Sequence, residues 1–319
     1  MISLGVVIIG RDEAMGLRSL ANILPSYPFD RIVYVDSNSS DESVAVARSA
    51  RWLVVSLQPD GILSAPAGRA IGTLLCETDW IIYLDGDMQP NFGTLSHCIE
   101  YLRECSDASV AGITGDIIDV YNANSQRVRV QRSMHRGRAK WFGGAVILKR
   151  QLVLAAGNWN PNVYASEEIE LYARLRKQGG SVVYFREPLV HHYTTYIPHR
   201  EIILNFLYLR QRKNPRNGGL GLAIRSALKH GSFTSLISLN PEPFFVFVVT
   251  PLLLALGCFG SWAAAAIILL GLLLWIGQRR GLQYFPVCYL LMPQMLVGLV
   301  KYREGEVCYS TEGEKQAFV

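Results

Sequence analysis

Residues 80–87, WIIYLDGD, contain the pattern that decides the fold. An unbroken apolar and aromatic run of this length is typical of a strand buried on both faces of a parallel sheet. The run ends at once in Asp85 and Asp87, which are separated by a glycine, and a similar run at residues 31–35 ends in Asp36. Because parallel strands end at the same edge of a sheet, where ligands bind, we expect these carboxylates to lie close together.

The rest of the first half repeats this alternation of strand and helix. Strands are expected at residues 4–9, 31–35, 53–57 and 80–84, and helices at 15–24, 42–50 and 65–75. A second block adds strands at 110–118 and 181–185, an apolar run at 142–148 and a helix at 167–177. The pattern predicts an α/β fold with a Rossmann-like, mostly parallel sheet flanked by helices.

Composition narrows the class of function. The net charge of +5 and the pI of about 8.9 are too mild for a dense nucleic-acid-binding face, so no nucleic acid partner is expected. None of the six cysteines forms a C-x-x-C pair, which favours free thiols in a reducing compartment. The first ten residues lack the basic and apolar regions of a signal peptide, so the front domain is expected to stay in the cytoplasm.

The last third of the chain has a different composition. Residues 244–277 contain no charged side chain, and they predict a transmembrane hairpin at about 243–277 that turns near 257–261. Basic residues on both sides of this segment, Arg225, Lys229, Arg279 and Arg280, place both ends in the cytoplasm. A third apolar segment at 282–300 either spans or stays at the interface. Residues 199–213 alternate apolar and basic side chains, which suits a helix on a membrane surface or on the domain surface.

These features divide the chain into four parts. Residues 1–198 form the catalytic domain, 199–240 the juxtamembrane helices, 241–301 the membrane region and 302–319 a tail. The expected location is therefore the inner or plasma membrane, with several crossings and a cytoplasmic catalytic domain.

The strongest chemical signal is the pair Asp85 and Asp87. Two carboxylates beside one small residue can hold a hard divalent cation through oxygen atoms, and such a cation can bridge a diphosphate. An Asp-x-Asp alone is more often a turn, but its place after a buried strand favours the metal site.

Several segments in order resemble family 2 glycosyltransferases of the GT-A fold, over roughly residues 1–195. They are VVIIGRDEAMGLRSLANIL (6–24), IVYVDSNSSDES (32–43), GRAIGTLLCETDWIIYLDGDMQP (68–90), FGGAVILKRQLVLAAGNWN (142–160) and SEEIELYARLRKQGGSVVYFREPLVHH (166–192). The resemblance implies that Asp36 contacts the nucleobase and that Arg69 lies near the donor phosphates. It implies Mn²⁺ or Mg²⁺ at Asp85 and Asp87.

The resemblance also implies roles in the second block. Gly143 and Gly144 let backbone approach the donor sugar. Glu168 matches the acid that takes the acceptor proton, with Glu167 as the alternative. His192 completes the metal shell or has a structural role, and Trp159 walls the acceptor site or belongs to the core. Basic residues guide phosphates or form a solvated face; they are Arg127, Arg129, Arg132, Arg136, Arg138 and Lys140.

The implied function is an inverting, metal-dependent transfer of one sugar from a UDP- or GDP-linked donor. A lipid-linked or glycan acceptor is expected, in cell-envelope glycan or exopolysaccharide synthesis, and homo-oligomerisation is left open. The Q-x-x-R-W motif of processive synthases is absent; residues 209–214 read LRQRKN. Two alternatives are a catalytically inactive membrane adaptor that binds a nucleotide-sugar and a sugar nucleotidyltransferase, although the first strand is followed by GRDEAMG rather than a Gly-rich G-x-G-T-R loop.

Overall fold

The computed structural model describes residues 2–121, 125–129, 134–135, 137–195, 219–280, 288, 295–300, 305–311 and 314–318. The first half contains β1 (Leu4–Gly10), α1 (Ala14–Ile23), the 3-10 helix η1 (Leu24–Ser26), β2 (Arg31–Asp36), α2 (Ser43–Ser49), β3 (Leu53–Leu57), α3 (Ala65–Leu75), β4 (Trp80–Asp85), β5 (Met88–Pro90) and α4 (Phe92–Glu104). The second block contains β6 (Val110–Tyr121), β7 (Ser125–Arg129), β8 (Met134–His135), β9 (Arg138–Ala139), β10 (Val146–Lys149), α5 (Arg150–Ala155), α6 (Glu167–Lys177) and β11 (Ser181–Tyr193). The last part contains α8 (Gly219–Lys229), α9 (Phe233–Leu239), α10 (Pro241–Cys258), α11 (Trp262–Arg280), β12 (Val307–Thr311) and β13 (Glu314–Phe318).

One mixed sheet organises the molecule. Its strands follow the order β13-β12-β3-β2-β1-β4-β10-β6-β11-β9-β8, with β5 paired to β11 and β7 to β6. Strands β3, β2, β1 and β4 are parallel, as predicted, but β10 is antiparallel to both β4 and β6. The expectation of a mostly parallel sheet is therefore corrected to a mixed one. The apolar run of β10 is visible in the sequence, but it does not indicate whether the strand runs parallel or antiparallel to its neighbours.

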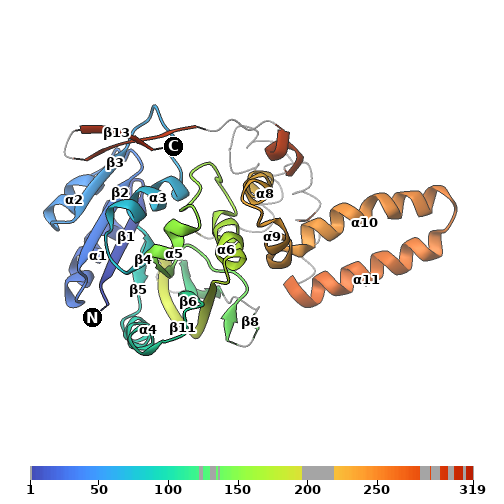
Figure 1. The fold of residues 1–319 in the computed structure, drawn as a ribbon, viewed down its shortest axis with the longest axis horizontal. Coiled ribbons are helices and arrows are strands. Elements are labelled where there is room, and N and C mark those ends of the chain that lie inside the picture. Colours follow the sequence, from blue (N-terminus) through green and yellow to red (C-terminus); the bar gives the residue numbers. More distant parts are fainter. Residues whose placement is uncertain are drawn as a thin grey trace.

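Helices cover both faces of the sheet (Figure 1). Alternate residues of β1 point to opposite faces, as the period of a strand requires. Val7 and Ile9 join a core under α3, α6 and α8, whereas Val6 and Ile8 join a core with α1, α2 and α4. The full burial of β1 and β4 explains why both strands read as continuous apolar runs.

Helix α3 begins where its sequence signals predict. The Ser64 side chain accepts a hydrogen bond from the Ala67 backbone N–H at 3.1 Å, and Pro66 lies in the first turn, where its missing N–H costs nothing. Helix α6 spans the predicted residues Glu167–Lys177, and Gly179, with a φ of 81°, follows its end. These two helices face the same edge of the sheet and carry site residues.

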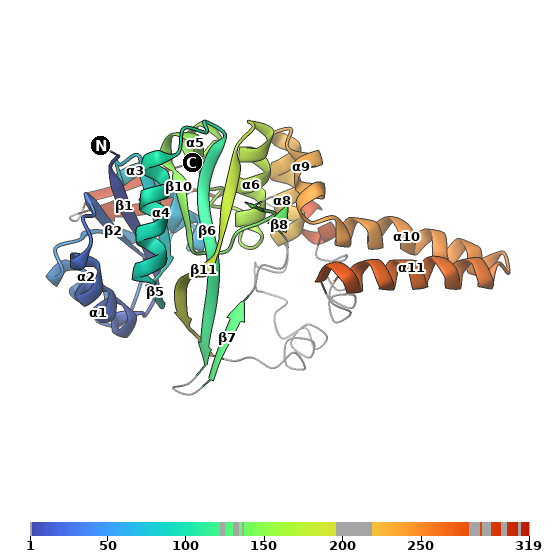
Figure 2. The ribbon, with the colours of Figure 1, turned by 90° about the horizontal axis from the view of Figure 1, so that it is seen from below.

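Helices α10 and α11 form a hairpin that extends away from the body of the molecule (Figures 1 and 2). Among the described residues, α10 is the one helix long and apolar enough to cross a bilayer, and the apolar stretch Trp262–Gln278 of α11 is shorter. Helix α10 contains Pro251, and 22% of its apolar window is buried. Over the described residues, the expectation of several crossings is therefore reduced to at most one candidate membrane helix.

Two predicted segments lie wholly or partly outside the described residues. The helix expected at 199–213, and with it the boundary after residue 198, falls in the undescribed range 196–218. The apolar segment 282–300 is described only at residue 288 and at 295–300. The tail, in contrast, returns to the catalytic domain, where β12 pairs antiparallel with β3 and extends the sheet.

Candidate active site

The ends of β1, β2 and β4 lie side by side, as the sequence pattern predicts. Gly10 is in register with Asp36, and Ile9 is in register with Asp85. An open pocket with an empty volume of about 830 Å³ lies at this edge. It is lined by Ile9, Gly10, Arg11, Glu13, Ser37, Leu63, Ser64, Ala65, Asp85, Gly86 and Asp87.

Asp36 lies behind this pocket rather than in its wall. Its carboxylate accepts hydrogen bonds from the Tyr34 hydroxyl and from the Ser39 backbone N–H, both at 3.1 Å, and only 2% of the residue is exposed. The neighbouring Ser37 lines the pocket instead. Contact between Asp36 and a nucleobase therefore stays a prediction.

Asp41 connects the N-termini of α1 and α2. One carboxylate oxygen accepts the Ser43 backbone N–H of α2 at 2.9 Å, and the other accepts the Ala14 N–H of α1 at 3.0 Å. These bonds hold the loop that follows β1 against the loop that follows β2, at the rim of the pocket.

Asp87 pairs with a histidine that is distant in sequence. Strand β5 pairs with β11 so that His192 is in register with Met88. Nε2 of His192 lies 3.1 Å from Oδ2 of Asp87, and its Nδ1 lies 2.8 Å from Oδ1 of Asp119. Burial disfavours the charged imidazole, but the hydrogen bonds to Asp87 and Asp119 outweigh burial and raise the pKa of His192 to about 8.

A divalent cation suits the oxygens at this edge. Oδ1 of Asp87 is buried and has no hydrogen-bond partner among the described residues, which is costly unless a ligand occupies it. The Asp85 side chain, 34% exposed, lies two residues away at the end of β4. The described residues contain no ready group of three or more His, Cys, Asp or Glu ligands. Both ring nitrogens of His192 contact carboxylates here, so its place in a metal shell stays a prediction.

Arg69 connects the two acidic clusters. Its guanidinium donates to Oδ1 of Asp85 at 3.0 Å and to Oε1 of Glu167 at 3.2 Å, and it lies 3.8 Å from Oε1 of Glu168. The side chain is 2% exposed and lies over the ring of Trp159 at 5.1 Å. Arg69 is thus occupied by carboxylates, and its contact with donor phosphates stays a prediction.

Gly144 packs directly on this ion pair. A Cβ at Gly144 would lie 2.9 Å from both the Arg69 guanidinium and Oδ2 of Asp85. A Cβ at Gly143 would lie 2.8 Å from Ile117. Glycine at these positions therefore permits close approach beside Asp85, and contact with the donor sugar stays a prediction.

Glu168 lies in the first turn of α6, next to the Arg69 cluster. Burial, followed by the charge of Glu167, raises the pKa of Glu168 to about 8 even though Arg69 opposes the shift. About a fifth of the side chain, 21%, remains exposed. A carboxyl group with such a raised pKa is a strong proton acceptor once it is ionised.

Glu13 is a site residue whose role the sequence left open. It is half-buried, and burial together with the charges of Asp87 and Asp85 raises its pKa to about 7. A Cβ at Gly86 would lie 2.8 Å from the Cβ of Glu13, so the glycine between the two aspartates lets Glu13 approach them. The signal available in the sequence was an acidic residue three positions after Gly10, the last residue of β1.

Trp159 belongs to the core. It is 1% exposed and makes edge-to-face contacts with Tyr83 at 5.2 Å and Phe142 at 6.3 Å. The structure therefore favours the core reading over an acceptor wall. Of the basic stretch, Arg138 pairs with Asp107 at 3.1 Å, and the side chains of residues 122–136 lie outside the description.

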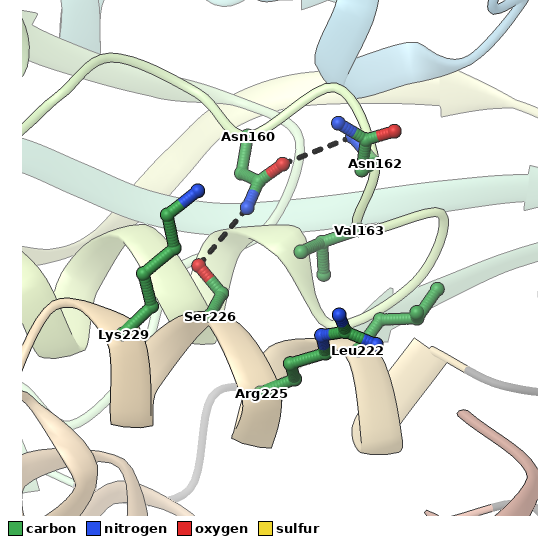
Figure 3. A pocket seen from close by; sticks show the side chains of 7 residues that line it. All are labelled: Asn160, Asn162, Val163, Leu222, Arg225, Ser226 and Lys229. Carbon is green, nitrogen blue, oxygen red and sulfur yellow. Dashed lines mark hydrogen bonds between the residues drawn. The ribbon is translucent and has the colours of Figure 1, made fainter. Parts of the chain in front are cut away.

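A second, smaller pocket lies between α8 and the loop before α6 (Figure 3). Asn160 donates to the Ser226 hydroxyl at 3.0 Å and accepts the Asn162 backbone N–H at 3.0 Å. Arg225 and Lys229 of α8 add positive charge at the pocket. This pocket is separate from the carboxylate edge.

Comparison with known proteins agrees with this geometry. The model of the family "Glycosyl transferase family 2" matches residues 14–151, the part that contains α1, β4 and the Asp85–Asp87 pair. This part of the chain therefore resembles family 2 glycosyltransferases, and the fold of the chain is the GT-A fold.

Individual relatives are distant. A pre-mycofactocin glycosyltransferase of Mycobacterium tuberculosis is 24% identical over 203 residues, which are 59% of this chain and 42% of the relative. The chain thus spans less than half the length of that curated relative.

Two solved structures share the fold. A mannosyltransferase from Pyrobaculum calidifontis, in complex with GDP-Man and Mn²⁺, superposes with a TM-score of 0.60 at 14% identity and covers 95% of this chain and 88% of its own. Residues 1–349 of TarS from S. aureus superpose with a TM-score of 0.56 at 12% identity and cover 100% and 99% of the two chains. At such identities the likeness concerns the fold alone.

Proposed function

We propose that the protein moves a single sugar from a nucleotide-activated donor to an acceptor hydroxyl, with a divalent cation held by Asp85 and Asp87. One observation carries this proposal: a buried oxygen of Asp87 without a partner lies beside an open pocket at the carboxyl edge of the sheet. Mn²⁺ or Mg²⁺ suits such oxygen ligands. When bound, the cation neutralises the charge that develops on the departing nucleoside diphosphate.

The donor is a UDP- or GDP-sugar. The pocket contains Ser37 at the end of β2 and Ser64 at the start of α3, which are polar groups for a nucleoside. The structural neighbour from Pyrobaculum calidifontis binds GDP-Man with Mn²⁺. Gly143 and Gly144 leave room for the sugar beside Asp85, and Asp36 lies behind the nucleobase side.

Glu168 acts as the base in this proposal. Its carboxylate takes the proton of the acceptor hydroxyl while that oxygen bonds to the anomeric carbon. The bond from this carbon to the nucleoside diphosphate breaks in the same displacement, so the configuration is inverted. Glu167 hydrogen-bonds Arg69, which leaves Glu168 as the freer acid of the pair.

A lipid-linked acceptor fits an enzyme that works at a membrane, and envelope glycan or exopolysaccharide synthesis is the corresponding process. The α10–α11 hairpin exposes large apolar side chains along both helices, including Val248, Leu254, Phe259 and Ile267. We infer that it inserts into the cytoplasmic face of the inner or plasma membrane. Since β11 and β12 belong to one sheet, any crossings between them must be even in number. This supports a hairpin over three crossings.

The double substitution Leu254→Asp and Ile267→Asp is expected to abolish binding to phospholipid vesicles. These side chains are 66% and 72% exposed, so the fold should persist. Each Asp costs about 2.5–3.5 kcal/mol in a bilayer core. Vesicle flotation measures the effect, with Met15→Asp, at an exposed apolar site on α1, as the matched control. Equal flotation of the double variant and the unaltered protein would contradict membrane insertion.

A donor screen tests the transfer itself. The protein, purified in detergent with Mn²⁺, is expected to release nucleotide from one of a set of UDP-, GDP- and dTDP-sugars. Folded protein that neither releases nucleotide nor gains thermal stability from any nucleotide would support the inactive adaptor instead.

A further inference from the structure

A segment near the C-terminal end of the described chain contacts a loop that forms part of the wall of the donor pocket. Residues 305–311, here the C-terminal segment, run along residues 58–64, here the pocket loop, which connects β3 to α3. The Gln58 N–H donates to the carbonyl of Cys308 at 2.7 Å, and the Ile62 N–H donates to the carbonyl of Glu306 at 2.9 Å. The loop is thus bonded to the segment at its first residue and again at Ile62.

Further contacts fix the two segments in one register. Tyr309 pairs with Leu57 in the sheet, and the Gln58 side chain donates to the Ser310 hydroxyl at 2.9 Å. Ile62 and Val307 are buried in the same core, at 7% and 0% exposure. Gly61 lies so close that a Cβ there would be 2.5 Å from the backbone nitrogen of Cys308.

The C-terminal segment is also tied to the catalytic body. The Gly305 N–H donates to Oδ1 of Asn162 at 3.0 Å, and the Asn162 N–H donates to Asn160 (Figure 3). Ser64, at the far end of the pocket loop, donates to the carbonyl of Pro161 in the same connection. The pocket loop is therefore held between the C-terminal segment and residues 160–162.

The last two residues of the pocket loop form part of the wall of the donor pocket. Leu63 and Ser64 line the pocket together with Glu13 and Asp87, whereas no residue of the C-terminal segment lines it. Loops are the mobile parts of a fold, and a ligand that must order one loses affinity. Contacts that order the loop in the free protein reduce the entropy that would otherwise be lost when the ligand orders it.

We propose that the C-terminal segment positions the pocket loop for the nucleotide of the donor, so that residues far beyond the apolar hairpin help to set donor affinity. The proposal rests on the proposed function, because the ligand of this pocket is taken to be a nucleoside diphosphate. The segment is a positioning element, since its contacts reach the donor through the loop.

The test uses Gly61→Ala in the full-length chain. The new methyl group meets backbone atoms of Cys308 and Glu306 and must push the segment and the loop apart. Gly93→Ala is the matched control, because its nearest neighbour would lie 3.6 Å away, in ordinary contact. Gln58→Ala, which removes the bond to Ser310, is a milder second variant.

Dissociation constants for UDP and GDP, each with Mn²⁺, are measured together with melting temperature and hydrogen exchange of residues 58–64. Gly61→Ala is expected to raise the dissociation constant of the tighter-binding nucleotide about tenfold and to speed hydrogen exchange in the loop. Gly93→Ala should change neither quantity. A role in stability alone would lower the melting temperature of Gly61→Ala and leave the dissociation constant unchanged.

The positioning role of the C-terminal segment and the proposed function are contradicted by different results. Unaltered protein that binds nucleotide, with Gly61→Ala binding equally well, would overturn the positioning role and leave the proposed function intact. Unaltered, folded protein that binds neither UDP nor GDP would overturn the proposed function, and the role of the C-terminal segment in donor binding would fall with it.

Discussion

Glu168→Gln is expected to lower kcat by about 10²–10⁴-fold, the usual contribution of a positioned general base. The substitution keeps the size of the side chain and its place beside Arg69 but removes the oxygen that takes the acceptor proton. Donor binding should change little, because Glu168 does not line the donor pocket. Steady-state kinetics with the identified donor and acceptor measure both quantities.

The pH profile separates this role from a structural one. Because burial raises the pKa of Glu168 to about 8, the carboxyl is largely protonated at neutral pH and cannot accept a proton. The rate of the unaltered enzyme should therefore rise with pH and level off above about 8, and Glu168→Gln should lose this rise. Glu167→Gln is the neighbouring control. If Glu167→Gln lost both the rate and the pH dependence while Glu168→Gln kept them, the base would be Glu167.

Arg69→Met is expected to destabilise the fold by about 3–5 kcal/mol, the cost of removing one partner from a buried ion pair. The substitution leaves the carboxylates of Asp85 and Glu167 without the cation that they share. The melting temperature should fall by roughly 10 °C, since a loss of about 1 kcal/mol lowers it by roughly 2–4 °C for a domain of this size.

Two further variants test the cause of this loss. Arg48→Met, at an exposed position of α2, should stay within about 0.5 kcal/mol of the unaltered protein. Combining Arg69→Met with Glu167→Gln should recover part of the stability, because one unpaired charge is removed. A fully stable Arg69→Met would show that Arg69 does not hold the two acidic clusters together.

The alternation of strands and helices in the first half of the chain was predictable because its strands are buried on both faces. The strand at Leu53–Leu57 and the helices at Ala65–Leu75 and Glu167–Lys177 have the predicted bounds, since caps and apolar spacing act locally. The direction of β10 and the return of β12 to β3 depend on contacts between distant segments. A local sequence pattern does not predict which distant strands pair.

The candidate site follows the same division. The shared edge of Asp36 and Asp85 follows from parallel strands and was predicted. The pairing of β5 with β11, which places His192 against Asp87, has no local signal. Two carboxylate partners of Arg69, Glu167 and Glu168, likewise come from the distant helix α6, with Glu167 98 residues away. The sequence thus predicted which residue types gather at the edge, whereas their pairing required the fold.

Metal-assisted transfer is tested by nucleotide release from the identified donor, measured with and without Mn²⁺ for the unaltered protein and Asp87→Ala. We expect metal-dependent release by the unaltered protein and a loss of about 10³-fold in Asp87→Ala, because an ion at this site would supply several kcal/mol of charge stabilisation. Release by Asp87→Ala at the rate of the unaltered protein, or release that is indifferent to metal, would contradict a metal-assisted transfer at this edge of the sheet.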